Sequence, residues 1–220
     1  MSRFDLCAFD LDGTLIDTRD DLAASINVVR ARFGLPPVPV PQVVRWVGDG
    51  APVLVARALG NPEASPLDNE QTTAGLALFR EHYTEHMLDQ ARPYAGVPET
   101  LAELRERELT LVVASNKPVA MCRDMLDRLG LGEHFADVSG GDSLPVSKPD
   151  PAPILALLEA HGAPAERAVM IGDGTQDLEA GRAAKVTTVA ALWGFRDRAE
   201  LEPFAPDHWV ERFADLLELV

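Results

Sequence analysis

The 220-residue sequence predicts an α/β protein with a doubly wound parallel sheet and an all-helical insert after its first strand. Three observations support this prediction: an apolar run near the N-terminus ends in acidic residues, the next 75 or so residues show only helical patterns, and strand and helix patterns then alternate to the C-terminus. We therefore expect residues 1–17 and 92–220 to form the α/β core and residues 18–91 to form the insert.

The first strand is predicted by the apolar run from Phe4 to Phe9, which Asp10 ends. Ligands of open α/β sheets bind at the carboxyl ends of strands, and residues two apart in an extended chain point the same way. Asp10 and Asp12 can therefore converge, and such a pair either holds a cation or keeps one acid protonated. For phosphoryl transfer, Asp10 would be the nucleophile and Asp12 the acid and later the base. The alternative is a solvated Asp-Gly turn.

The insert shows helical spacing of apolar residues, for example at Leu22, Ile26, Val29 and Phe33. Gly34 and a proline-rich turn then end this first helix. The predicted helices of the insert cover residues 19–33, 41–46, 51–59 and 68–90.

After Pro93 the pattern alternates between strands and helices. Such alternation predicts parallel strands joined by right-handed crossovers, with helices on both faces of the sheet. The predicted helices are 97–108, 118–129, 151–161 and 176–184, and the predicted strands are 110–115, 137–141, 168–173 and 186–192. A short strand at 207–210 and a final helix close the chain.

Polar residues recur where these strands end. Ser115 and Asn116 offer a hydroxyl and an amide that can donate to phosphate oxygens, although a helix cap is the alternative. Lys117 follows them and could be a solvated charge. Lys148 precedes Pro149, which keeps it out of a helix and could turn it toward the sheet edge; a surface lysine is the alternative.

Two more acids follow the strand predicted at 168–173. Magnesium takes oxygen ligands and needs only one or two carboxylates besides a substrate phosphate. Asp173 would join Asp10 in holding the ion. Asp177 would be a further ligand or orient a bound water, or it is simply an acid well placed in a first helical turn.

The composition excludes some partners. A net charge of −15 argues against a nucleic-acid surface, which needs clustered basic residues. The absence of an apolar run of about 20 residues, and of a basic start with an apolar stretch behind it, predicts a cytoplasmic protein without a membrane segment. Cys7 and Cys122 show no metal-ligand spacing and are expected to be buried. A monomer and a homodimer both stay open.

Taken in order, these motifs resemble those of the haloacid dehalogenase superfamily of phosphohydrolases, over essentially the whole chain. The resemblance implies that Asp10 is the nucleophile and Asp12 the acid/base. It implies Ser115 and Lys148 as phosphate clamps, and Mg²⁺ on Asp10, the Asp12 carbonyl and Asp173. The insert is similar to the helical cap of this superfamily, which closes over small substrates.

The stretch 45–51, together with 140–145 and 148–151, is similar to phosphoglycolate phosphatases. This resemblance implies a small phosphorylated metabolite, 2-phosphoglycolate, as substrate. Arg45 and the amides around Gly48 would bind its carboxylate, unless Arg45 is a surface charge. Further substrate-binding candidates are Thr14, Asn116 and Lys117.

Two positions depart from the family pattern, because Asp49 replaces a common Asn and Gly174 a common Ser. Other hypotheses for the function also stay open. They are a phosphatase for a sugar phosphate or pyrophosphate, a sugar-phosphate mutase, a binding module without turnover, and a dehalogenase that works without a metal.

Overall fold

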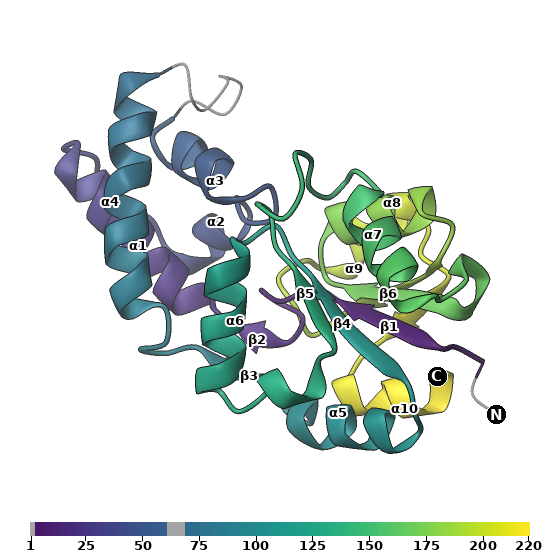
Figure 1. Ribbon diagram of the computed structural model, residues 1–220. Coiled ribbons are helices and arrows are strands. Elements are labelled where there is room, and N and C mark those ends of the chain that lie inside the picture. The colour runs from purple at the N-terminus through teal and green to yellow at the C-terminus, as the bar shows by residue number, and fades with distance from the viewer. Residues whose placement is uncertain (1–2, 61–68) are drawn as a thin grey trace. The chain divides into compact units, whose positions relative to one another are not determined.

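The computed structural model describes residues 3–60 and 69–220. The chain forms two compact units (Figure 1). The core unit is Met1–Asp17 with Pro93–Val220, and the helical unit is Thr18–Arg92. None of the helices among the described residues combines the length and apolar character that crossing a membrane requires.

The core unit contains a six-stranded parallel sheet with the order β5-β4-β1-β6-β7-β8, which confirms the predicted α/β fold. Its strands are β1 (Leu6–Phe9), β4 (Thr110–Ala114), β5 (Asp137–Ser139), β6 (Ala168–Gly172), β7 (Thr187–Ala191) and β8 (His208–Val210). The α-helices are α5 (Val97–Glu106), α6 (Val119–Arg128), α7 (Ala152–His161), α8 (Thr175–Ala183), α9 (Arg198–Leu201) and α10 (Leu216–Leu219). Short 3₁₀ turns are η1 (Gly132–His134), η2 (Ala165–Arg167), η3 (Glu202–Phe204) and η4 (Phe213–Asp215).

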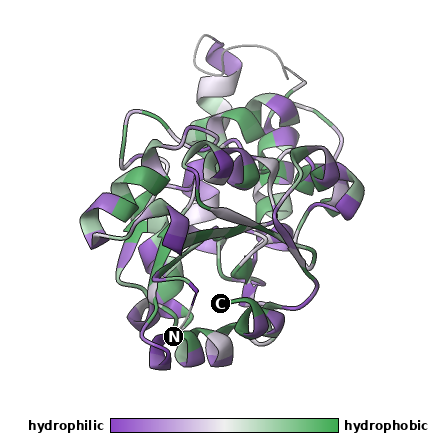
Figure 2. Ribbon diagram, turned by 90° about the vertical axis from the view of Figure 1, so that its right-hand side faces the viewer, coloured by the Kyte–Doolittle hydropathy of each residue, from purple (hydrophilic) through white to green (hydrophobic). Residues whose placement is uncertain are grey.

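Alternate side chains of the central strands enter two different apolar layers, as the pleat of a strand requires. Leu6 and Ala8 of β1 belong to a buried cluster with residues of α7 and α8. Phe9 lies on the opposite face, where its ring stacks on Phe213 of η4. Both faces of β1 are therefore covered, which is why its sequence is apolar throughout. The strands in the middle of the sheet have the green colour of hydrophobic residues in Figure 2.

The order of the strands places the site. The chain proceeds outward from β1 to β4 and β5, then returns to the other side of β1 with β6. A topological switch point thus lies between β1 and β6, where ligand sites of such sheets form. In the register, Phe9 pairs with Ile171, and the Asp10 amide donates to the Ile171 carbonyl at 2.9 Å. The residues that follow β1 and β6 must therefore be neighbours.

The described part of the helical unit contains α1 (Arg19–Arg32), α2 (Val40–Val44), α3 (Ala51–Ala58) and α4 (Glu70–His86). Helix α1 packs against the other three, with Leu22, Ile26 and Val29 buried. Two short strands that the sequence did not predict, β2 (Ile16–Asp17) and β3 (Arg92–Pro93), pair where the chain passes between the units.

The last helix of this unit is shorter than the predicted 68–90. Residue 68 lies outside the described residues, and α4 ends at His86 rather than at residue 90. The reason is the buried Asp21 of α1, whose carboxylate accepts hydrogen bonds from the amides of Gln90 at 3.0 and 3.1 Å and of Ala91 at 2.8 Å. These amides leave the helix to meet a carboxylate, a contact between segments distant in sequence that helical periodicity cannot anticipate.

Asp21→Ala should destabilise the helical unit by about 2–4 kcal/mol, because the amides of Gln90 and the buried Ala91 would lose a charged acceptor. Asp20→Ala is the matched control, since Asp20 lies in the same first turn of α1 but is exposed. Urea unfolding followed by circular dichroism measures both changes. Equal stability of the two variants would contradict the role given to Asp21.

Candidate active site

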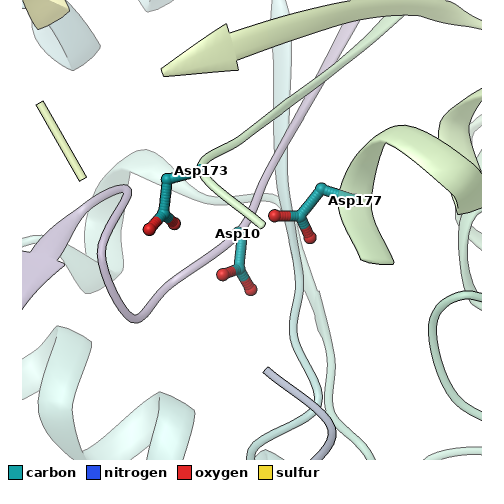
Figure 3. A group of neighbouring side chains, drawn as sticks. All are labelled: Asp10, Asp173 and Asp177. Carbon is teal, nitrogen blue, oxygen red and sulfur yellow. The ribbon is translucent and has the colours of Figure 1, made fainter. Parts of the chain in front are cut away.

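Three carboxylates gather at the carboxyl end of the sheet (Figure 3). Asp10 follows β1, Asp173 follows β6, and Asp177 lies in the first turn of α8. Each contributes an oxygen, and these oxygens all lie within 4.8 Å of one another. The parallel pairing of β1 with β6 brings the first two together, and the tight turn into α8 brings the third.

Lys148 supplies the positive charge for this cluster. Its ammonium donates to Asp10 Oδ1 at 2.9 Å and to Asp177 Oδ1 at 2.5 Å, and its side chain is only 2% exposed. The Asn116 amide nitrogen in turn donates to the Lys148 carbonyl at 2.7 Å. The loop that precedes α7 is thereby held against the loop that follows β4.

The electrostatics show that this cluster is short of positive charge. Burial raises the pKa of Asp173 to about 8, and repulsion from Asp10 and Asp177 contributes to the rise. Burial also raises the pKa of Asp10, with Lys148 opposing the shift and Asp177 adding to it. Burial lowers the pKa of Lys148, but Asp10 and Asp177 outweigh it, so that its pKa lies above the ordinary value. A buried oxygen-rich site of this charge suits a hard divalent cation.

Both carboxylate oxygens of Asp173 accept hydrogen bonds from the protein. The Thr14 hydroxyl donates to its Oδ1 at 2.8 Å, and the Phe195 amide donates to its Oδ2 at 2.7 Å. Two glycines allow the backbone this close: a Cβ at Gly13 would lie 2.3 Å from Asp173 Oδ2, and one at Gly194 would lie 2.2 Å from Asp173 Cβ. Gly13 also has φ of +89°, a conformation that glycine adopts without strain.

Asp12 is paired separately. The Lys117 ammonium donates to Asp12 Oδ1 at 2.8 Å, with both side chains largely buried. The Ser115 hydroxyl accepts from the Lys117 amide at 3.3 Å, and the Lys117 carbonyl accepts from the Gly141 amide at 2.9 Å. A Cβ at Gly141 would lie 2.4 Å from the Asn116 carbonyl oxygen. The segment 115–117 is thus fixed between β4 and the turn after β5, which is why β5 ends at Ser139 instead of residue 141.

The core unit therefore brings together the predicted residues Asp10, Asp173, Asp177 and Lys148, with Asp12 paired to Lys117 beside them. The hydroxyl of Thr14, a predicted substrate contact, donates to Asp173 in this structure. Asn116 and Lys117 likewise hold other site residues in this structure. Their binding of substrate stays a prediction.

Two predicted site residues, Arg45 and Gly48, belong to the helical unit. Arg45 is exposed at the end of α2, and Gly48 precedes α3 with φ of +129°. The departure at Asp49 has a local counterpart, because Arg57 approaches its carboxylate at 2.5 Å and also donates to the Trp46 carbonyl at 2.8 Å. The anion at Asp49 thus has a cation beside it in the same unit.

The sequence reasoning missed the segment after β7. There the Trp193 indole N–H donates to the Thr14 carbonyl at 2.9 Å, and the Phe195 amide donates to Asp173. A signal was present, since Trp-Gly-Phe follows the carboxyl end of a predicted strand. At the other departure from the family pattern, the Gly174 amide donates to Asp177 Oδ2 at 2.9 Å.

Residues 7–191 match the family model of haloacid dehalogenase-like hydrolases. The chain is 39% identical to phosphoglycolate phosphatase 1 of Pseudomonas aeruginosa, over 96% of this chain and 78% of the relative. It is 36% identical to phosphoglycolate phosphatase of Mannheimia succiniciproducens, over 100% of this chain and 99% of the relative. A crystal structure of a predicted phosphoglycolate phosphatase from Haemophilus somnus superposes with a TM-score of 0.91 and 32% identity, over 100% and 99% of the two chains.

These similarities and the fold define the class. The chain belongs to the haloacid dehalogenase-like hydrolase family. It is an enzyme of the phosphatase class.

The raised pKa values predict a pH dependence of stability in EDTA. Asp173 has a pKa of about 8 in the fold against an ordinary value of 3.8, so between these values the native state keeps a proton that the unfolded state releases. Its contribution to stability therefore falls as pH rises from about 4 to about 8. Asp10→Asn removes a neighbouring charge and should flatten this slope.

Thermal unfolding from pH 5 to pH 8 measures the effect. We expect the melting temperature of the wild type to fall by about 3 °C or more relative to that of Asp10→Asn over this interval. Asp5→Asn is the control, because Asp5 is exposed and pairs with Arg167 outside the cluster. Parallel curves for all three proteins would contradict the assignment.

Proposed function

We propose that the chain is a Mg²⁺-dependent phosphatase that hydrolyses 2-phosphoglycolate to glycolate and phosphate through an aspartyl phosphate. The observation that carries the proposal is the buried group of Asp10, Asp173 and Asp177 with Lys148 in contact with two of them. The substrate is supported by full-length relatives named phosphoglycolate phosphatase. It is also supported by residues 45–51 and 140–145, whose sequences are similar to those of phosphoglycolate phosphatases.

The donor set fits magnesium. Asp10, Asp173 and Asp177 offer only oxygen, and a single ammonium leaves their charge partly unbalanced. Asp10 and Asp173, with the Asp12 carbonyl, would hold the ion, and Asp177 would hold a ligand water or Lys148. Once bound, the ion would neutralise the substrate phosphate and favour the ionised form of its ligands. The remaining steps belong to the side chains of the protein.

In the first step, the free carboxylate oxygen of Asp10 attacks phosphorus, and the bond from phosphorus to the glycolate oxygen breaks. Asp12 delivers a proton to that oxygen, so glycolate leaves as an alcohol. Lys148 donates to Asp10 Oδ1, which fixes the direction of attack, and its charge suits the transferred phosphoryl group. Ser115 is the proposed hydroxyl donor to the phosphate.

In the second step, Asp12 as carboxylate takes a proton from water while that water attacks phosphorus. The bond between Asp10 and phosphorus breaks, which releases phosphate and restores both acids. The Lys117 contact at 2.8 Å holds Asp12 in position for both proton transfers. Arg45 and the amides near Gly48 remain our candidates for the substrate carboxylate.

Initial rates on a panel of phosphate esters test the substrate. At equal concentrations with Mg²⁺, kcat/KM for 2-phosphoglycolate should exceed that for glucose 6-phosphate, pyrophosphate and p-nitrophenyl phosphate by at least about 10-fold. EDTA should abolish all turnover and Mg²⁺ should restore it. A higher value for a sugar phosphate or pyrophosphate would replace the substrate while keeping the chemistry.

Asp10→Asn tests the covalent step. Turnover should fall by at least about four orders of magnitude, because the nucleophile is lost. Wild-type enzyme quenched in acid during turnover of ³²P-labelled substrate should carry the label, and Asp10→Asn should not. Asp5→Asn, which changes an exposed acid just before β1, should behave as the wild type. An unlabelled wild type that still turns over would overturn the aspartyl phosphate.

A further inference from the structure

We propose that Trp193 is a positioning residue for Asp173 and that it acts through the main-chain carbonyl of Thr14. The inference rests on the proposed role of Asp173 as a ligand of the metal ion. It assigns to the segment after β7 a part in setting how tightly that ion is bound.

A continuous series of hydrogen bonds connects Trp193 to Asp173 through Thr14. The Trp193 Nε1–H donates to the Thr14 carbonyl at 2.9 Å, and the Thr14 hydroxyl donates to Asp173 Oδ1 at 2.8 Å. The same hydroxyl accepts from the Asp173 amide at 3.1 Å, so Thr14 and Asp173 are joined twice. Thr14 is fully buried, and a buried carbonyl without a donor is costly. The indole thus fixes the residue that orients the carboxylate.

The same segment reaches Asp173 directly. Two residues after Trp193, the Phe195 amide donates to Asp173 Oδ2 at 2.7 Å. Gly194 between them leaves no space for a side chain, since a Cβ there would overlap the Cβ of Asp173 at 2.2 Å. Each oxygen of Asp173 therefore accepts one hydrogen bond from the protein and keeps lone pairs for an ion. Outer contacts of this kind orient metal-ligating carboxylates and govern affinity.

The indole itself is held by aromatic packing. Its ring meets Phe213 edge-on at 5.5 Å between centroids, and Phe213 stacks on Phe9 at 5.8 Å. Phe9 is the last residue of β1 and immediately precedes Asp10. One aromatic cluster thus connects the strand that presents Asp10 with the segment that orients Asp173, so the two carboxylates share a rigid support.

Trp193→Phe removes the N–H while it keeps a ring against Phe213. We expect the dissociation constant for Mn²⁺ alone, measured by electron paramagnetic resonance of the free ion, to rise about 10-fold. The Mg²⁺ concentration for half-maximal activity should rise equally, while KM for the ester at saturating Mg²⁺ stays unchanged. Trp209→Phe is the matched control, because that ring lies under Arg198 at 4.3 Å and away from Thr14. It should keep wild-type metal affinity.

A second pair of variants tests the link through Thr14. Thr14→Val loses the hydroxyl and should weaken Mn²⁺ binding by about 10- to 100-fold, whereas Thr14→Ser keeps it and should stay near the wild type. If Trp193→Phe does not fold, as circular dichroism would show, benzothienylalanine at position 193 gives the same ring shape without the N–H. The same loss of Mn²⁺ affinity is then expected.

The outcomes separate the two proposals. Wild-type Mn²⁺ affinity in the variants without the N–H at position 193 would overturn the positioning role and leave the proposed function intact. Equal loss in Trp209→Phe would also overturn it, because a general effect of tryptophan removal would then be responsible. A wild-type protein that binds neither Mn²⁺ nor Mg²⁺ would overturn the metal-dependent function first.

Discussion

The main physical constraint on the candidate site is the gathering of acidic side chains at the carboxyl end of the sheet in the core unit. Oxygens of Asp10, Asp173 and Asp177 lie within 4.8 Å of one another, and the Lys148 ammonium contacts two of these residues. Burial and mutual repulsion raise the pKa values of Asp10 and Asp173, which is a cost to the fold. A site tuned for folding alone would not keep such a group, and the divalent cation proposed for this site would offset its charge.

The sheet topology tells why these acids meet. Strand β1 has β4 on one side and β6 on the other, and the chain order reverses between β1 and β6. The residues directly after β1 and β6 therefore lie together at the carboxyl end of the sheet, although residues 10 and 173 are far apart in sequence. The sequence could predict this much, because apolar runs ended by Asp10 and Asp173 mark both strands and the carboxyl ends of parallel strands coincide. The alternation of strand and helix patterns likewise predicted helices on both faces of the sheet.

What the sequence could not predict is which polar groups bind one another. Thr14, Asn116 and Lys117 are predicted to bind substrate, and the structure adds contacts that the sequence did not predict, to Asp173, the Lys148 carbonyl and Asp12 respectively. The type of side chain is the same for either role, and only the fold decides which acceptor is within 3 Å. Asp21 is a parallel case in the helical unit, since its carboxylate meets amides about 70 residues away and ends α4 early.

These contacts also show that some residues of the site hold other residues of the site in place. Three charged residues of the proposed site are held by residues from other segments: the Asp173 carboxylate by Thr14, the Lys148 main chain by Asn116, and the Asp12 carboxylate by Lys117. Such non-covalent contacts hold reacting groups in place before substrate binds. Preorganised electrostatic stabilisation of the transition state is usually the largest contribution to catalysis. Trp193 has the same kind of role at a greater distance from the site. Its indole packs on Phe213 and donates to Thr14, so the aromatic cluster restricts the movement of the residue that binds the Asp173 carboxylate. The C-terminal segment, which supplies Phe213, is thereby connected to the chemistry that begins at Asp10.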